Sequence, residues 1–111
     1  MEYRDLLARI RAFRDERDWA QFHNPKDLAI SLALESSELL ECFQWSGTDA
    51  SVDGKRDAMR EELADIFMYA VYFADSIDID LLDAVCKKLD VNGDKYPVDS
   101  SRGNARKYTD L

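Results

Sequence analysis

The sequence predicts an all-α protein, a four-helix bundle that assembles as a homo-oligomer. Apolar residues recur at intervals of three and four along most of the 111 residues, and the chain has only four glycines and two prolines. Because 46% of the residues are apolar, we expect a single domain over residues 1–111 with its own core. The longest apolar run, residues 66–74, is about half of the roughly 18–20 residues that span a bilayer, so no membrane helix is expected.

The first two predicted helices cover residues 2–17 and about 25–45. The first has an apolar stripe with charged residues elsewhere, which is typical of a surface helix. The second begins with Asn24 as its N-cap and Pro25 at its first helical position, where the missing N–H needs no partner. Residues 46–54 collect Gly, Ser, Thr and Asp without periodicity, so they are predicted to form a loop.

The third predicted helix spans about residues 55–77, and the fourth runs from Asp80 as N-cap to Asn92-Gly93, a common left-handed terminator. Apolar residues 66–74 face every direction around the third helix, which is more than the inside of one small bundle covers. We therefore expect burial against a second copy, in a homo-oligomer. Residues 94–111 are predicted to form an irregular C-terminal tail.

The charge of the chain is concentrated in its middle. The formal net charge is −8, and residues 19–86 carry 14 acidic side chains against four basic ones, whereas residues 87–111 carry six basic against four acidic. Binding of duplex nucleic acid needs a basic stripe, so no nucleic-acid partner is expected. The N-terminus lacks the pattern of a secretion signal, and Cys42 and Cys86 are predicted to be buried thiols in a cytoplasmic protein.

Acidic residues share a face on each of the two middle helices, because they lie three apart. They are Glu35, Glu38 and Glu41 on one helix, and Glu62 and Asp65 with the neighbouring Glu61 on the other. Like charges at this spacing destabilise a helix by roughly 0.2–0.5 kcal/mol per pair, and a divalent cation would offset that repulsion. Oxygen ligands without His or Cys favour Mg²⁺, or Mn²⁺, over zinc or copper. The spacing by itself leaves a solvated acidic face equally open.

Motifs along nearly the whole chain resemble those of the MazG-like all-α nucleoside triphosphate pyrophosphohydrolases, especially the dCTP pyrophosphatase branch. The matching motifs are Arg17-Asp18-Trp19, Gln21-Phe22-His23, Pro25, Glu35-Ser36-Ser37-Glu38-Leu39-Leu40-Glu41, Phe43-Gln44-Trp45, Glu61-Glu62-Leu63-Ala64-Asp65, Tyr69, Lys88, Asn92, Tyr96-Pro97 and Arg106-Lys107-Tyr108. The resemblance implies a magnesium-dependent dimer or tetramer that cleaves a nucleotide between its α and β phosphates, releasing a nucleoside monophosphate and pyrophosphate.

The resemblance also implies roles for individual residues. The implied magnesium ligands are Glu35, Glu38, Glu62 and Asp65. The implied base and sugar pocket comprises Trp19, Ala20, Gln21, Phe22, His23, Trp45 and Tyr69. The chain departs from the family at two places, because Ile10 stands where one related form has a histidine and the loop after Trp45 is shorter than in vertebrate relatives.

Other residues are candidates for the chemistry itself, since phosphoryl transfer depends on positioning and on charge neutralisation. The candidates for the catalytic base are Glu38, Glu41 and Glu61, and the sequence does not choose among them. Basic residues near the C-terminus are predicted to meet the β and γ phosphates, unless they form a solvated tail. The polar residues Asn92 and Tyr96 lie near these basic residues in the sequence and are included with them. The predicted substrate-binding set is Lys88, Asn92, Lys95, Tyr96, Arg106 and Lys107.

Alternatives remain open at the level of residues and of function. An indole at a helix end stacks on a base or anchors a core, and both roles are open for Trp19 and Trp45. A non-enzymatic reading is a helical oligomerisation module whose acidic face binds basic partners. A third reading keeps the fold and changes the substrate to dUTP or a phosphoribosyl nucleotide. Removal of damaged nucleotides from the pool follows only from analogy with the family.

Overall fold

All regular elements in the computed structural model, which describes residues 1–111, are helices or helical turns. The chain forms two compact units, Met1–Asp78 and Ile79–Leu111. The predicted all-α class is confirmed, while the single domain, the packing of four helices into one bundle and the homo-oligomer stay predictions. No helix combines the length and the apolar composition needed to cross a bilayer.

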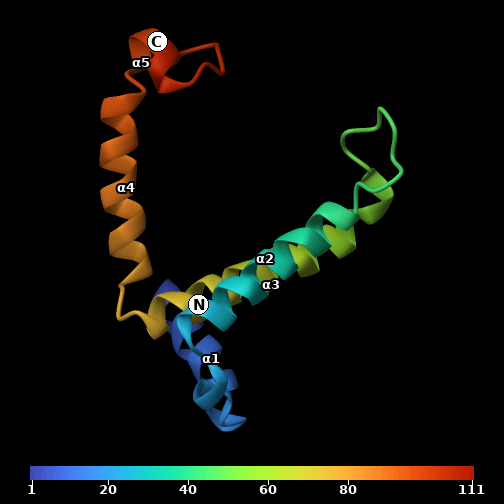
Figure 1. Cartoon of the computed structure of the whole chain (residues 1–111), viewed down its shortest axis with the longest axis vertical. Helices are drawn as coiled ribbons and strands as arrows, with labels where there is room; N and C mark the ends of the chain where they lie inside the picture. The colour runs from blue at the N-terminus through green and yellow to red at the C-terminus, as the bar shows by residue number, and fades with distance from the viewer. The chain divides into compact units, whose positions relative to one another are not determined.

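The first unit contains three long helices and two short 3₁₀ turns. These are α1 (Tyr3–Glu16), η1 (Trp19–Phe22), α2 (Pro25–Glu41), η2 (Asp53–Lys55) and α3 (Arg56–Ser76). Helices α2 and α3 lie side by side as a helical hairpin (Figure 1), and α1 contacts α3. Two positions that face the inside of this unit are almost fully buried, Leu28 of α2 at 2% exposure and Val71 of α3 at 1%.

The start of α2 follows the predicted capping chemistry. The side chain of Asn24 accepts a hydrogen bond from the backbone N–H of Asp27 at 2.9 Å. Pro25 occupies the first helical position, and Asp27 lies in the first turn, where a negative charge stabilises the helix. The predicted N-terminus of this helix is confirmed.

The end of α2 differs from the prediction, because the helix stops at Glu41 and not near Trp45. Residues 42–44 form hydrogen bonds of 3.0–3.2 Å to the carbonyl three positions before, which tightens the chain into turns. Trp45 then adopts a φ of 66°, in the left-handed region of the backbone that residues other than glycine rarely adopt. The irregular segment therefore begins four residues earlier than the predicted loop, and η2 replaces the last residues of that loop from Asp53 onward.

The core of the first unit is small. Its buried apolar residues are Ile10, Leu28, Cys42, Val71, Tyr72 and Ala74. The hydroxyl of Tyr72 donates a hydrogen bond to the carbonyl of Ile10 at 2.8 Å, which joins α3 to α1. Every residue of the apolar run 66–74 is buried or half-buried within one copy, although Phe67 and Met68 line an open hollow. The homo-oligomer stays a prediction.

The second unit consists of α4 (Leu81–Lys95), α5 (Val98–Ser101) and η3 (Tyr108–Asp110). Asp80 is the N-cap as predicted, since its side chain accepts a hydrogen bond from the N–H of Asp83 at 3.1 Å. The predicted end at Asn92-Gly93 was wrong, because α4 continues through Gly93 to Lys95. A glycine in a helix costs about 1 kcal/mol relative to alanine, and the continuing backbone hydrogen bonds offset this cost.

The C-terminal tail is less irregular than predicted. Residues 94 and 95 belong to α4, and two short helical turns follow. The rings of Tyr96 and Tyr108 pack edge to face with centroids 6.0 Å apart, and the Nζ atom of Lys95 lies 4.8 Å from the Tyr108 ring centre. The tail is therefore held against the end of α4 by aromatic contacts.

The two cysteines differ in their surroundings. Both are free thiols, and Cys42 is buried as predicted. Cys86 is exposed, which contradicts its prediction as a buried thiol, because the side of α4 that carries it is not covered.

Candidate metal centre and nucleotide site

Helices α2 and α3 bring acidic side chains together within the hairpin. One carboxylate oxygen from each of Glu35, Glu62 and Asp65 lies within 4.8 Å of the others. Glu62 and Asp65 are three apart on α3 and so share a face, while Glu35 comes from α2. All three residues are half-buried. Three of the four predicted metal ligands therefore converge.

Glu38, the fourth predicted ligand, is exposed but interacts with the same cluster. Burial, then a hydrogen bond with Glu38 and the charge of that residue, raises the pKa of Glu35 to about 7. A hydrogen bond with Glu38, followed by burial, also raises the pKa of Glu62. Without a cation, the proximity of these carboxylates therefore favours the protonated forms of Glu35 and Glu62.

The chemistry of this cluster fits a divalent cation. The Oε2 atoms of Glu35 and Glu62 are shielded from water and have no hydrogen-bond donor. An unsatisfied buried polar group costs about 1–3 kcal/mol, and more when it is charged. A cation beside these atoms would satisfy both of them, and a set of carboxylate oxygens alone suits Mg²⁺ or Mn²⁺.

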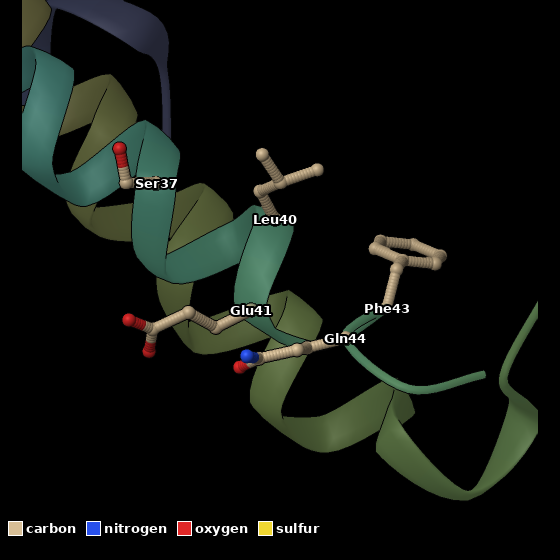
Figure 2. Close-up of a pocket in the computed structure, with 5 residues that line it drawn as sticks. All are labelled: Ser37, Leu40, Glu41, Phe43 and Gln44. Carbon is tan, nitrogen blue, oxygen red and sulfur yellow. The ribbon is translucent and has the colours of Figure 1, made fainter.

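The other two candidate bases lie in different places. Glu61 is exposed on α3, and its charge contributes to the raised pKa of Glu62. Because an α-helix has 3.6 residues per turn, Glu41 lies roughly 120° around the axis of α2 from Glu35. It lies at an open hollow of about 430 Å³ near the end of α2 (Figure 2), with Ser37, Leu40, Phe43 and Gln44. Glu61 is thus near the cluster, whereas Glu41 faces another side of α2. The prediction that Glu41 shares a face with Glu35 was wrong, because two spacings of three residues add up to a rotation of about 120°.

The predicted base-binding segment follows directly after α1. Asp18 has a φ of 53° and turns the chain into η1, which contains Trp19, Ala20, Gln21 and Phe22. The side-chain amide of Gln21 donates to the backbone oxygen of Asp18 at 3.2 Å and to its carboxylate at 2.8 Å, which ties the turn together. Trp19 is 43% exposed and Phe22 is 65% exposed, so both aromatic side chains are accessible to a ligand.

A chain of aromatic contacts connects this segment to α3. The ring centroid of His23 is 5.1 Å from that of Tyr72, and Tyr72 packs edge to face with Tyr69 at 6.1 Å. Tyr69 lies one helical turn after Asp65 and so shares its side of α3. Burial, and then the charge of Arg14, lowers the pKa of His23, so its ring is neutral at pH 7. The aromatic segment and the carboxylate cluster belong to one packed unit.

Trp45 lies beyond the end of α2 and is 93% exposed. The alternative that Trp45 anchors the core is therefore wrong for a single copy of this chain. A side chain of this size, held at a positive φ and almost fully in water, is available for a ligand or a second copy.

The predicted phosphate-binding residues all belong to the second unit. Lys88, Arg106 and Lys107 are exposed, while Asn92 and Lys95 are half-buried. Tyr96 is occupied in its contact with Tyr108. Their role in binding phosphate stays a prediction.

Sequence reasoning missed a cluster of ion pairs between α1 and α3. Arg11 and Arg14 both bond the carboxylate of Asp75, at 3.0 and 2.9 Å. The guanidinium of Arg14 also lies 5.7 Å from the ring centre of Tyr72. The spacing of three between the two arginines indicated a shared face. Their partner, however, lies 64 residues from Arg11 and 61 residues from Arg14 in the sequence.

A helical hairpin with converging carboxylates, joined to an exposed aromatic segment, defines an all-α protein with a candidate divalent-metal centre. The chain belongs to the MazG-like family, whose model matches residues 30–111.

Three proteins similar to this chain carry related names. The dCTP pyrophosphatase 1 of Mus musculus is 46% identical over 111 residues, covering 95% of this chain and 65% of the mouse protein. The dCTP pyrophosphatase 1 of Bos taurus is 47% identical, covering 95% and 66%. The chain thus spans about 65% of the length of these mammalian relatives. A pyrophosphatase crystal structure from Archaeoglobus fulgidus has a TM-score of 0.76 and 38% identity, covering 85% of this chain and 91% of that one.

Proposed function

We propose that the chain is a Mg²⁺-dependent nucleoside triphosphate pyrophosphohydrolase that prefers dCTP or modified pyrimidine deoxynucleotides. The observation that carries this proposal is the convergence of Glu35, Glu62 and Asp65 in the unit that also bears the aromatic segment. The mammalian relatives named dCTP pyrophosphatase 1 support this choice of substrate. In the reaction, water adds to the α-phosphorus, the bond to the bridging α–β oxygen breaks, and dCMP and pyrophosphate leave.

The carboxylates would hold the cation through Glu35, Glu38, Glu62 and Asp65. Mg²⁺ bound there supplies positive charge against the negative triphosphate. The protein's own contribution is to fix these oxygens on two packed helices, so that the charges are arranged before the substrate arrives. The unpaired Oε2 atoms of Glu35 and Glu62 support this assignment.

The proton of the attacking water needs an acceptor within hydrogen-bonding reach. Glu38 and Glu61 are exposed and border the cluster, since each influences the pKa of Glu62. Glu41 faces another side of α2, so the geometry favours Glu38 or Glu61 as the base. We assign Glu41 a supporting role at most.

The base and sugar are proposed to bind at the aromatic segment, through Trp19 to His23, with Tyr69 and Trp45. Stacking of a base on an aromatic side chain is worth about 1–3 kcal/mol. The exposure of Trp19 and Phe22 supports this role. The basic residues of the second unit, Lys88, Lys95, Arg106 and Lys107, are proposed to bind the β and γ phosphates, with Asn92 and Tyr96 beside them.

We further propose that the chain works as a homodimer or homotetramer in the cytoplasm. The support for oligomerisation is a set of large apolar side chains on the hairpin that water contacts in one copy. They include Leu34 at 60%, Leu40 at 70% and Leu63 at 61% exposure. Large apolar side chains with this exposure are candidates for burial against a second copy.

The experiment incubates the purified chain with Mg²⁺ and each common or modified deoxynucleoside triphosphate, and separates the products by chromatography. Formation of dCMP with equimolar pyrophosphate, lost in Glu62→Gln and retained in the exposed control Glu16→Gln, is the expected result. Preference for dUTP or a phosphoribosyl nucleotide would keep the reaction and change the substrate. Absence of turnover, with no thermal stabilisation by Mg²⁺ and nucleotide, would contradict the proposal in favour of a binding module.

A further inference from the structure

Arg17, the C-cap of α1, covers a pair of aromatic rings next to the base-binding segment. Its guanidinium carbon lies 3.7 Å from the ring centre of Phe13 and 6.0 Å from that of Trp19. The rings of Phe13 and Trp19 pack edge to face, with centroids 5.7 Å apart and planes 75° apart. These three planar groups form one cluster at the end of α1.

The orientation of Arg17 is set by this cluster and not by an ion pair. Its Nη1 atom donates a hydrogen bond to the backbone oxygen of Phe13 at 2.9 Å. The nearest carboxylate, that of Glu16, is 3.8 Å away and exposed, and such surface pairs contribute little. A guanidinium over a ring face within about 6 Å is attracted by the electrons of that ring. Arg17 is thus fixed above Phe13 by two separate contacts.

Trp19 needs a contact of this kind because the backbone leaves it at the surface. Asp18 has a left-handed φ of 53° and directs the chain away from α1. The hydrogen bonds from Gln21 hold the backbone turn, but they do not restrain the indole of Trp19. With 43% of Trp19 exposed, Phe13 and Arg17 are the aromatic and cationic groups that lie against its ring.

We propose that Arg17 is a positioning residue for substrate binding, which together with Phe13 holds the Trp19 indole ready for the nucleotide base. This inference rests on the proposed function, because it assumes that Trp19 contacts the base. A side chain that is already oriented loses less freedom when the ligand binds, and affinity rises accordingly. Arg17 acts through Trp19 and does not touch the phosphates, so it affects substrate binding and not the chemical step.

The test compares Arg17→Gln and Arg17→Lys with Arg4→Gln, which removes the same charge from an exposed position on the same helix. Loss of an exposed cation–π contact predicts a rise of about two- to fivefold in KM for dCTP. We expect kcat to stay within about twofold, since the change is in binding alone. Arg17→Lys keeps the charge but loses planar stacking. Its KM should therefore lie between that of the unsubstituted chain and that of Arg17→Gln. Arg4→Gln should leave both constants unchanged.

A second measurement follows the indole without any substrate. In a Trp45→Phe background Trp19 is the single tryptophan, and acrylamide quenching of its fluorescence reports how freely the ring moves and how far it is exposed. Arg17→Gln should increase quenching, while Arg4→Gln should not. Equal quenching in the two variants, or a fall in kcat without a rise in KM, would overturn the inference. Absence of turnover in the unsubstituted chain would instead refute the proposed function, and quenching would still decide whether Arg17 holds Trp19.

Discussion

Arg11 of α1 donates two parallel hydrogen bonds to Asp75 of α3, from Nε to Oδ2 at 3.0 Å and from Nη2 to Oδ1 at 3.0 Å. Arg14 adds a bond at 2.9 Å to the same carboxylate. Helix α1 leads into the aromatic segment, and α3 carries Glu62 and Asp65. This bidentate pair therefore fixes the helix that precedes the proposed base pocket against the helix that carries the carboxylates.

Replacing Asp75 with asparagine should destabilise the protein. The side chain of Asp75 is 21% exposed, and loss of its charge leaves Arg11 without a carboxylate partner and Arg14 with Asp15 alone. Hydrogen bonds to charged groups contribute about 1.5–3 kcal/mol, so we expect a decrease of that size in the free energy of unfolding. Urea denaturation at pH 7 measures it. Asp90→Asn, at an exposed position of α4, is the control and should change stability by less than about 0.5 kcal/mol.

The effect of Asp75→Asn should shrink in acid. Burial would raise the pKa of Asp75, but the hydrogen bonds and charges of Arg11 and Arg14 outweigh it and lower the pKa below 3.8. A carboxylate with a lowered pKa stabilises the fold above its unfolded pKa, and this contribution is lost as the pH falls through the folded value. The difference between the variant and the unsubstituted chain should therefore narrow as the pH falls below 3.8. A constant difference would mean that the carboxylate charge is not responsible.

Magnesium should stabilise the protein through the carboxylate cluster. A ligand that binds only the native state contributes about 2.7 kcal/mol at a concentration of 100 times its Kd. In Glu62→Gln this stabilisation should largely disappear. The same variant should be more stable than the unsubstituted chain in EDTA, because one of the mutually repelling carboxylates is gone. Thermal unfolding with Mg²⁺ or EDTA measures both effects, and an undiminished response to Mg²⁺ in Glu62→Gln would exclude this cluster as the site.

Without a cation, Glu35 should make stability depend on pH. Burial first, and Glu38 second, raises the pKa of Glu35 from 4.5 to about 7. A raised pKa means that the folded state binds the proton more tightly, so the contribution is complete below pH 4.5 and is lost as the pH rises to about 7. Urea denaturation in EDTA should show declining stability across this interval, with a smaller decline in Glu35→Gln. Parallel curves for the two proteins would contradict the assignment to Glu35.

Local chemistry in the sequence predicted several features that the structure contains. The caps Asn24 and Asp80 are examples, because a short polar side chain before a helix has one evident partner. A spacing of three likewise placed Glu62 and Asp65 on one face, but it could not show which face of α2 they meet. Gly93 shows the limit of local rules, since its left-handed preference is overridden by the continuing helix.

Contacts between distant segments could not be predicted from the sequence. Arg11 and Asp75 are 64 residues apart, and each is an ordinary charged residue in its own helix. The position of Arg17 over Phe13 also depends on where the turn at Asp18 sends the chain. The exposure of Trp45 follows from the end of α2 at Glu41. The periodicity of the sequence had predicted that this helix continues for four more residues.

Trp45→Asn should separate binding from stability. Trp45 is 93% exposed and has a φ of 66°, a conformation that asparagine tolerates better than other residues. We expect the free energy of unfolding to change by less than about 0.5 kcal/mol, while nucleotide binding weakens by about 1–3 kcal/mol through loss of stacking. Urea denaturation and the KM for dCTP measure the two quantities. A loss of stability with unchanged KM would place Trp45 in a packing contact outside the pocket.

The exposed apolar side chains of the hairpin should be covered by a second copy in solution. Leu63, at 61% exposure, borders an open apolar hollow of about 380 Å³ that Leu6, Ile10 and Phe67 also line. Light scattering should give a multiple of the 12.8 kDa chain mass. Leu63→Asp should shift the population toward one copy, because a buried carboxylate without a partner costs several kcal/mol. Circular dichroism must show that the Leu63→Asp variant stays helical. If light scattering gives the unsubstituted chain the mass of one copy, that result contradicts the proposed oligomer.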